Sequence, residues 1–111
     1  MITIDTLKEY NTLIHTNKLI LIYAGLTTCP PCNIVYPKFE LLEKDLEEKN
    51  IVLCKIIVDK IQDLSEKAEI KKCLNLKEYP IFTVIQDKNI LEQKKTANID
   101  EVKQLITYLD I

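Results

Sequence analysis

The sequence Thr28-Cys29-Pro30-Pro31-Cys32 places two thiols three positions apart, with only prolines between them. An apolar run over residues 19–24 precedes this motif and predicts a central strand that is covered on both faces. A helical pattern follows the motif from Pro31. Only a thiolate attacks a disulfide, and a helix N-terminus lowers the pKa of a cysteine placed there. The arrangement therefore predicts a thiol–disulfide oxidoreductase.

The two cysteines receive different predicted roles. Cys29 comes just before the helix and is the expected nucleophile, whereas Cys32 is one turn into the helix and is expected to resolve the mixed disulfide. Pro30 and Pro31 suit the first helical turn, but neither has an N–H to donate to the sulfur of Cys29, so only the N–H of Cys32 is left. A poorly stabilised thiolate is typical of a weak oxidant, which favours a reductase over a strong oxidase.

Two other interpretations of the cysteine pair stay open at this point. A structural zinc usually takes four Cys or His ligands, often as two spaced pairs, whereas Cys54, Cys73 and His15 are isolated in the sequence. We therefore predict no metal site. A purely structural disulfide is the second alternative, but a three-residue spacing closes too small a loop to restrain the unfolded chain much.

Length and composition predict one globular domain over residues 1–111, with 47% apolar and 29% charged residues. The net charge of −2 argues against general nucleic-acid binding, which favours a basic chain. The sequence holds a single glycine and therefore has no Gly-rich phosphate loop.

Targeting signals and membrane spans are not evident. No stretch approaches the roughly 20 apolar residues of a bilayer-spanning helix, and the N-terminus lacks the pattern of a signal peptide. If the sequence is complete, a cytoplasmic location is expected, where a Cys-x-x-Cys pair is more often catalytic than structural. If a leader has been removed, the location is extracytoplasmic.

Hydrophobic periodicity predicts strands alternating with helices. Strands are expected over 2–4 (at the sheet edge), 18–24, 51–58, 81–85 and 90–94. Helices are expected over 6–15, opened by a Thr6–Glu9 capping box, from Pro31 with a kink at Pro37, over 61–74, and from 98. The buried stripes of the last three helices are expected to be Val35, Phe39, Leu42 and Leu46; Ile61, Leu64, Ala68 and Leu74; and Val102, Leu105, Ile106 and Leu109. This order predicts an α/β fold, a mixed sheet with helices on both faces.

Three further residues have chemistry of their own. Cys54, in an apolar strand, is expected to be a packed core residue. Lys55 in the same strand either extends its ammonium to a strand edge or places it behind the cysteine pair, where it would bias thiol ionisation. Cys73 is expected to have a structural or incidental role, with a regulatory thiol as the alternative.

The chain resembles the thioredoxin family over nearly all of its length. The resemblance rests on the Cys29–Cys32 motif after a central strand, on Pro37 five residues beyond Cys32, and on Pro80 before a hairpin. It implies the thioredoxin fold, no cofactor beyond the redox-active disulfide, disulfide-containing protein substrates, a thioredoxin reductase as electron donor, and a monomer.

The resemblance also implies roles for individual residues. Pro80 is expected to follow a cis bond and to face the dithiol, while Tyr79 offers backbone hydrogen bonds to a bound substrate chain. Thr28 borders the same substrate-binding site, but it stands where typical members have Trp. Lys55 and Asp59 match a Lys and an Asp of the family. Tyr23 stands where the family has a buried, proton-relaying Asp, and both Lys55 and Tyr23 are expected to support the dithiol.

Three functions follow from these observations. The first is a thioredoxin-like enzyme that reduces protein disulfides. The second is a dedicated disulfide oxidant or maturation factor for one partner, and the third is a redox-inert binding module that uses the fold as a scaffold, since fold alone does not fix function.

Overall fold

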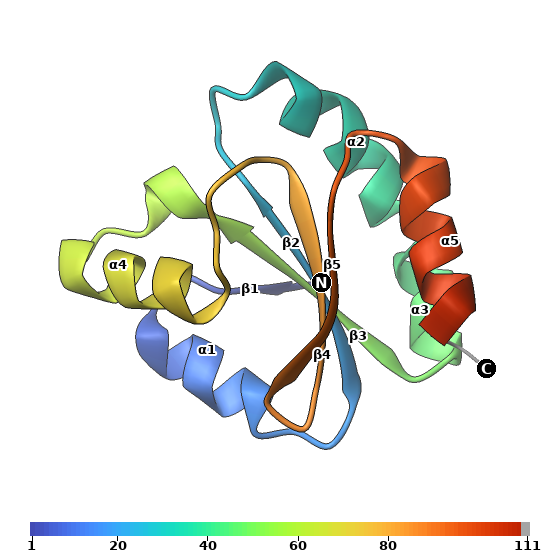
Figure 1. Ribbon diagram of the computed structural model, residues 1–111, viewed down its shortest axis with the longest axis horizontal. Helices are drawn as coiled ribbons and strands as arrows, with labels where there is room; N and C mark the ends of the chain where they lie inside the picture. The colour runs from blue at the N-terminus through green and yellow to red at the C-terminus, as the bar shows by residue number, and fades with distance from the viewer. Residues whose placement is uncertain (110–111) are drawn as a thin grey trace.

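The computed structural model describes residues 1–109, apart from the side chain of Leu109. Its elements run in the order β1 (Ile2–Thr3), α1 (Leu7–Ile14), β2 (Leu19–Gly25), α2 (Pro30–Glu40), α3 (Glu43–Glu48), β3 (Ile51–Ile57), the 3-10 turn η1 (Val58–Lys60), α4 (Leu64–Cys73), β4 (Ile81–Gln86), β5 (Asn89–Lys95) and α5 (Ile99–Leu109) (Figure 1). The predicted alternation of strands and helices is thereby confirmed.

The strands form one five-stranded mixed sheet in the order β1-β3-β2-β4-β5. The pairs β1/β3 and β3/β2 are parallel, whereas β2/β4 and β4/β5 are antiparallel. The apolar run that precedes the cysteine motif is β2, the middle strand of the sheet. Its register places Ala24 opposite Ile81, so the end of β2 and the start of β4 lie at the same edge of the sheet.

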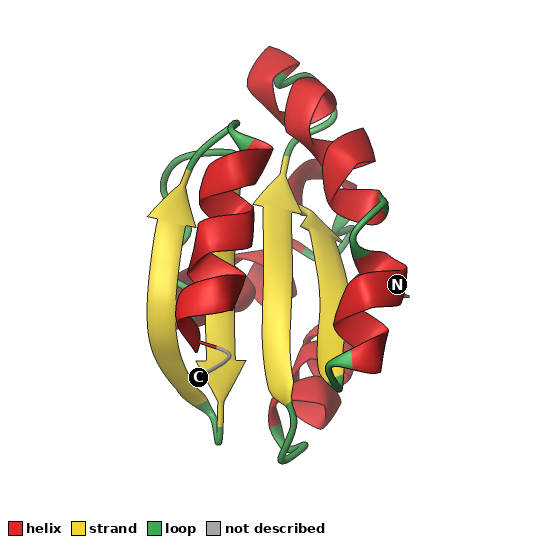
Figure 2. Ribbon diagram, turned by 90° about the vertical axis from the view of Figure 1, so that its right-hand side faces the viewer, coloured by secondary structure: helices red, strands yellow, loops and turns green. Residues whose placement is uncertain are grey.

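Helices cover both faces of this sheet, as predicted. Alternate residues of β2 point to opposite sides: Ile20 and Ile22 join the core beneath α1 and α4, whereas Leu21 and Tyr23 join the core beneath α2, α3 and α5. Figure 2 shows the second group of helices in front of the strands. No helix within residues 1–109 has the length and apolar character needed to cross a bilayer.

The helix after the cysteine motif differs from its prediction. It continues past Pro37 to Glu40, and the chain is interrupted at Leu41 and Leu42 before α3 begins. Leu41 is 81% exposed, whereas Leu46 on α3 is 3% exposed. The interruption redirects the chain so that Leu46 of the predicted apolar stripe still reaches the core. Pro37 lies inside α2, as predicted.

The prediction for α4 is wrong at its beginning. The Asp63 side chain accepts a hydrogen bond from the N–H of Glu66 (2.9 Å), and this cap starts the helix at Leu64 instead of residue 61. Ile61 is buried in the preceding loop, but Leu64 is 75% exposed and Ala68 is also exposed. The inward residues are Ile70 and Leu74. For α5 the predicted stripe of Val102, Leu105 and Ile106 is buried, and Leu109 lies outside the described side chains.

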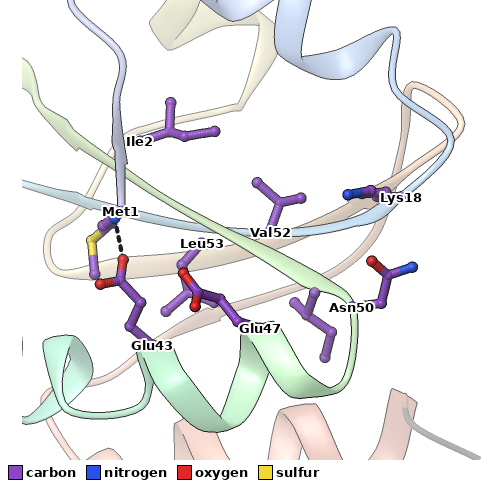
Figure 3. A pocket seen from close by; sticks show the side chains of 9 residues that line it. Met1, Ile2, Lys18, Glu43, Glu47, Asn50, Val52 and Leu53 are labelled. Carbon is purple, nitrogen blue, oxygen red and sulfur yellow. Dashed lines mark ion pairs between the residues drawn. The ribbon is translucent and has the colours of Figure 1, made fainter.

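A pocket of about 180 Å³ lies at the amino ends of β2 and β3, where Lys18 and Ile51 are among its lining residues. In Figure 3 the Glu43 carboxylate points to the α-amino group of Met1, with which it forms an ion pair. The cysteine motif follows the carboxyl end of β2, so this pocket is at the opposite end of the sheet from the motif.

Candidate redox site

The two sulfurs of the motif are joined in a disulfide at the N-terminus of α2. Cys29 is the N-cap residue, with extended backbone (φ −108°, ψ 106°), and its Sγ accepts a hydrogen bond from the N–H of Cys32 (3.3 Å). Pro30 and Pro31 occupy the first turn and are exposed. The N–H of Cys32, which the sequence left as the available donor within the motif, does reach the sulfur.

The two cysteines differ in exposure. Cys29 is half-buried, whereas Cys32 is 1% exposed and belongs to the core beneath α2. A protein disulfide arriving from solvent therefore meets Cys29 first. Thr28, which directly precedes Cys29 in the chain, is exposed.

The loop before β4 reaches the same edge of the sheet. The peptide bond between Tyr79 and Pro80 is cis, which confirms that prediction. Pro80 is buried, and its carbonyl accepts a hydrogen bond from the N–H of Thr96 (3.2 Å). Since Ala24 pairs with Ile81, Pro80 and the loop that leads to Cys29 both lie at this edge (Figure 1).

Comparison with known proteins gives the family. The thioredoxin family model matches residues 1–110. The chain belongs to the thioredoxin family. Among curated relatives, the thioredoxin of Coprinus comatus is 32% identical over 103 residues, covering 93% of this chain and 92% of the relative. The thioredoxin of Ictalurus punctatus is 31% identical over 90 residues, covering 81% and 78%.

Solved structures agree on the fold. The thioredoxin of Plasmodium falciparum superposes with a TM-score of 0.84 at 23% identity, covering 97% of this chain and 98% of the other. The thioredoxin of Fasciola hepatica gives a TM-score of 0.82 at 24% identity, with the same coverage. Together, family membership and the Cys29–Cys32 disulfide identify a thiol–disulfide oxidoreductase whose redox group is its own pair of cysteines.

Tyr23 is the centre of an aromatic cluster. Its ring centroid lies 5.0 Å from that of Tyr36, 5.5 Å from that of Phe82 and 5.9 Å from that of Phe39. Burial, and secondarily Tyr36, raises the pKa of Tyr23 to about 12. The phenol is therefore protonated near pH 7 and is no equivalent of a carboxylate base there.

Lys55, on β3, extends its side chain towards Tyr36 of α2. Its strand β3 is an inner strand of the sheet, and its ammonium lies 5.3 Å from the ring centroid of Tyr36. A side-chain hydrogen bond to Tyr36 raises the pKa of Lys55, so the ammonium stays charged. A pocket of about 300 Å³ has Lys55, Tyr23 and Thr27 among its lining residues. The ammonium therefore lies beside Tyr36 of α2, and its influence on the dithiol stays a prediction.

Tyr79 has a buried hydroxyl. Its side chain packs against the cores on both faces of the sheet, and its Oη finds no hydrogen-bond partner among the described residues. Burial raises the pKa of this phenol. An unpaired buried hydroxyl costs stability, because folding removes its bonds to water without replacing them.

Replacing this hydroxyl by hydrogen is expected to stabilise the protein. We expect Tyr79→Phe to raise the free energy of unfolding by about 1 kcal/mol, measured by urea denaturation. Tyr36→Phe is the matched control, since the Tyr36 hydroxyl donates to Glu40 (3.3 Å), and its removal is expected to give no gain. A loss of stability in Tyr79→Phe would mean that the hydroxyl is paired in the folded protein.

The sequence did not predict a contact between the loop before Cys29 and the turn after β3. The Oδ1 of Asp59 accepts a hydrogen bond from the N–H of Thr27 (3.0 Å), and its Oδ2 accepts one from the Thr27 hydroxyl. The two residues are 32 positions apart. The resemblance to the family singles out Asp59 only as a matching residue, and no local sequence pattern pairs it with Thr27.

The remaining cysteines are free thiols. Cys54 is fully buried, as predicted, and burial raises the pKa of its thiol to about 12. Cys73 is exposed, and its Sγ lies 3.6 Å from Glu69, with burial and this carboxylate raising the pKa of the thiol. Within residues 1–109 no three His, Cys, Asp or Glu side chains gather as a metal site would require.

Proposed function

We propose that this protein reduces disulfide bonds in other proteins, with Cys29 as nucleophile and Cys32 as resolving thiol. The Cys29 thiolate attacks one sulfur of the substrate disulfide, which forms a mixed disulfide and releases a substrate thiolate. The Cys32 thiolate then attacks the Sγ of Cys29 and expels the second substrate thiolate. The substrate gains two electrons, and the Cys29–Cys32 disulfide forms.

The position of Cys29 supports this assignment best. It is the half-buried N-cap of α2, its sulfur accepts the N–H of Cys32, and Cys32 is buried behind it. A helix N-terminus stabilises a thiolate at the outer position, while the inner sulfur is shielded from external thiols. Pro30 and Pro31 start the helix without adding N–H donors, which favours the reducing direction over a strong oxidase.

Substrates and partners are proposed from the family. Disulfide-containing proteins are the substrates, and a thioredoxin reductase supplies the electrons. Thr28, Tyr79 and Pro80 contact the bound substrate, with the Tyr79 backbone pairing with the substrate chain, while Lys55 and Tyr23 support the dithiol. We further propose a monomer with one domain over residues 1–111, which acts in electron transport and redox homeostasis of the cytoplasm.

Reduction of insulin, followed by turbidity, tests the proposal. With dithiothreitol as the electron source, the protein is expected to accelerate insulin precipitation, and with a thioredoxin reductase and NADPH it is expected to turn over repeatedly. Acceleration with dithiothreitol alone would favour a dedicated partner in place of the general reductase. Acceleration with neither would favour the redox-inert module.

A further inference from the structure

A side chain from the turn after β3 fixes the loop that delivers Cys29. Asp59, in η1, accepts both the backbone N–H of Thr27 and the Thr27 hydroxyl, and so uses both carboxylate oxygens on one residue. Two bonds to one residue restrain its backbone as well as its side chain. Only Thr28 separates Thr27 from Cys29 along the chain.

These two segments meet because β2 and β3 end at the same side of the sheet. Strands β2 and β3 are parallel neighbours, with Gly25 opposite Ile57. The loop after Gly25 and the turn after Ile57 therefore leave the sheet side by side. Thr27 is exposed, so without the Asp59 bonds its hydroxyl and N–H would face water.

We propose that Asp59 is a positioning residue for Cys29, holding the 26–28 loop so that Cys29 keeps its N-cap geometry. The inference rests on the proposed role of Cys29 as nucleophile. Release of the loop would let the Cys29 sulfur move off the N–H of Cys32, with a bond of 3.3 Å in the anchored state. The thiolate then loses its hydrogen bond and rises in pKa, and the sulfur spends less time in the geometry of attack.

The negative charge of Asp59 and its anchoring of the loop shift the pKa of Cys29 in opposite directions, so the experiment must separate the two effects. The two Thr27 bonds lower the pKa of Asp59, and Lys67 contributes in the same direction, so the carboxylate is ionised near pH 7. The carboxylate is bonded to Thr27, two residues before Cys29, and a negative charge near a thiol disfavours the thiolate. Removing the charge alone therefore lowers the pKa of Cys29, whereas removing the anchor raises it.

Three variants separate anchoring from charge. Asp59→Asn keeps an oxygen for the Thr27 N–H and offers an amide to the hydroxyl, while it removes the charge. Asp59→Ala removes both. Asp63→Ala is the structural control, because Asp63 caps α4 and makes no bond to Thr27 in the structure. The measurements are the pH dependence of Cys29 alkylation by iodoacetamide in the reduced protein, and kcat/KM for insulin.

Asp59→Ala is expected to give a higher Cys29 pKa than Asp59→Asn, which shares the loss of charge, and to lower kcat/KM about tenfold because the reacting sulfur is misplaced. Asp59→Asn is expected to keep kcat/KM within about twofold of the parent, with an unchanged or lowered Cys29 pKa, since a neutral amide restores the anchor. Asp63→Ala is expected to leave both readouts unchanged.

Several outcomes would overturn the proposal. Equal effects of Asp59→Ala and Asp63→Ala would reduce Asp59 to a stability role, and an Asp59→Asn variant as impaired as Asp59→Ala would make the charge, not the anchor, the cause. A Cys29 pKa in Asp59→Ala that is no higher than in Asp59→Asn would also refute it, because both variants lack the charge and only Asp59→Ala lacks the anchor. If the parent protein does not reduce insulin, the proposed function fails, while the alkylation measurement still decides whether Asp59 positions Cys29.

Discussion

The Cys32→Ser variant is expected to accumulate a stable mixed disulfide with its substrate through Cys29, whereas Cys29→Ser is expected to lose insulin reduction by at least about a thousandfold. The asymmetry follows from the site. Cys29 is half-buried at the helix N-terminus, and Cys32 is 1% exposed behind it. Without Cys32 the first exchange still occurs, but no internal thiolate expels the captured substrate.

The two free thiols set the design of this trapping experiment. Cys73 is exposed and would capture disulfides on its own account, so each variant is made in a Cys73→Ser background. Cys54 can stay, because its thiol is fully buried and its pKa is raised to about 12, which leaves almost no thiolate at pH 8. The trapped complex is detected by non-reducing electrophoresis and its linkage by peptide mass mapping.

The contrary result is equally informative. If Cys29→Ser traps the substrate and Cys32→Ser does not, the roles of the two cysteines are reversed. If neither variant traps a substrate, although the parent protein reduces insulin, the exchange does not pass through a protein-bound mixed disulfide.

The sequence predicted most strongly where a local pattern decides the structure. A buried strand, a Cys-x-x-Cys pair and a proline-started helix are adjacent in the chain, so the position of Cys29 at the N-terminus of α2 follows from its neighbours alone. The cis bond before Pro80 followed from resemblance to the thioredoxin family and is confirmed. Burial of Cys54 followed from its apolar strand.

Periodicity failed where a short side chain starts or stops a helix. Asp63 caps α4 and shifts its start, so the predicted stripe placed the exposed Leu64 and Ala68 in the core, although its two end residues, Ile61 and Leu74, are buried. Contacts across the sheet were also beyond a one-dimensional pattern. The Thr27–Asp59 anchor joins residues 32 positions apart, and only the parallel pairing of β2 and β3 brings them together.

A contact between two residues of β2 gives the second large expected effect. Gly25 is the only glycine of the chain, and its φ is not positive, so no special backbone conformation requires it. It lies two residues after Tyr23, on the same face of the strand. A Cβ at position 25 would lie 2.6 Å from the Cζ of Tyr23 and closer still to its hydroxyl oxygen. The Tyr23 ring therefore occupies the space of the missing side chain.

Two effects of Gly25→Ala oppose each other, and their magnitudes decide the sign. Reduced freedom of the unfolded chain stabilises by about 0.4–1 kcal/mol where alanine fits the native backbone. Overpacking costs about 1–3 kcal/mol or more when the neighbour cannot move. Tyr23 is 2% exposed and is held among Tyr36, Phe39 and Phe82. We therefore expect a net loss of about 2 kcal/mol, seen as a fall in Tm of roughly 10 °C.

The second-site variants identify the clash as the cause. Tyr23→Phe removes only the hydroxyl and leaves Cζ against the new methyl group, so it is not expected to rescue Gly25→Ala. Tyr23→Leu, which shortens the side chain, is expected to make the double variant more stable than the two single losses predict, by about 1 kcal/mol in a double-mutant cycle. Additive losses with both partners would show that the ring moves freely, and the glycine would then lack a steric explanation. Full rescue by Tyr23→Phe would confine the conflict to the hydroxyl oxygen.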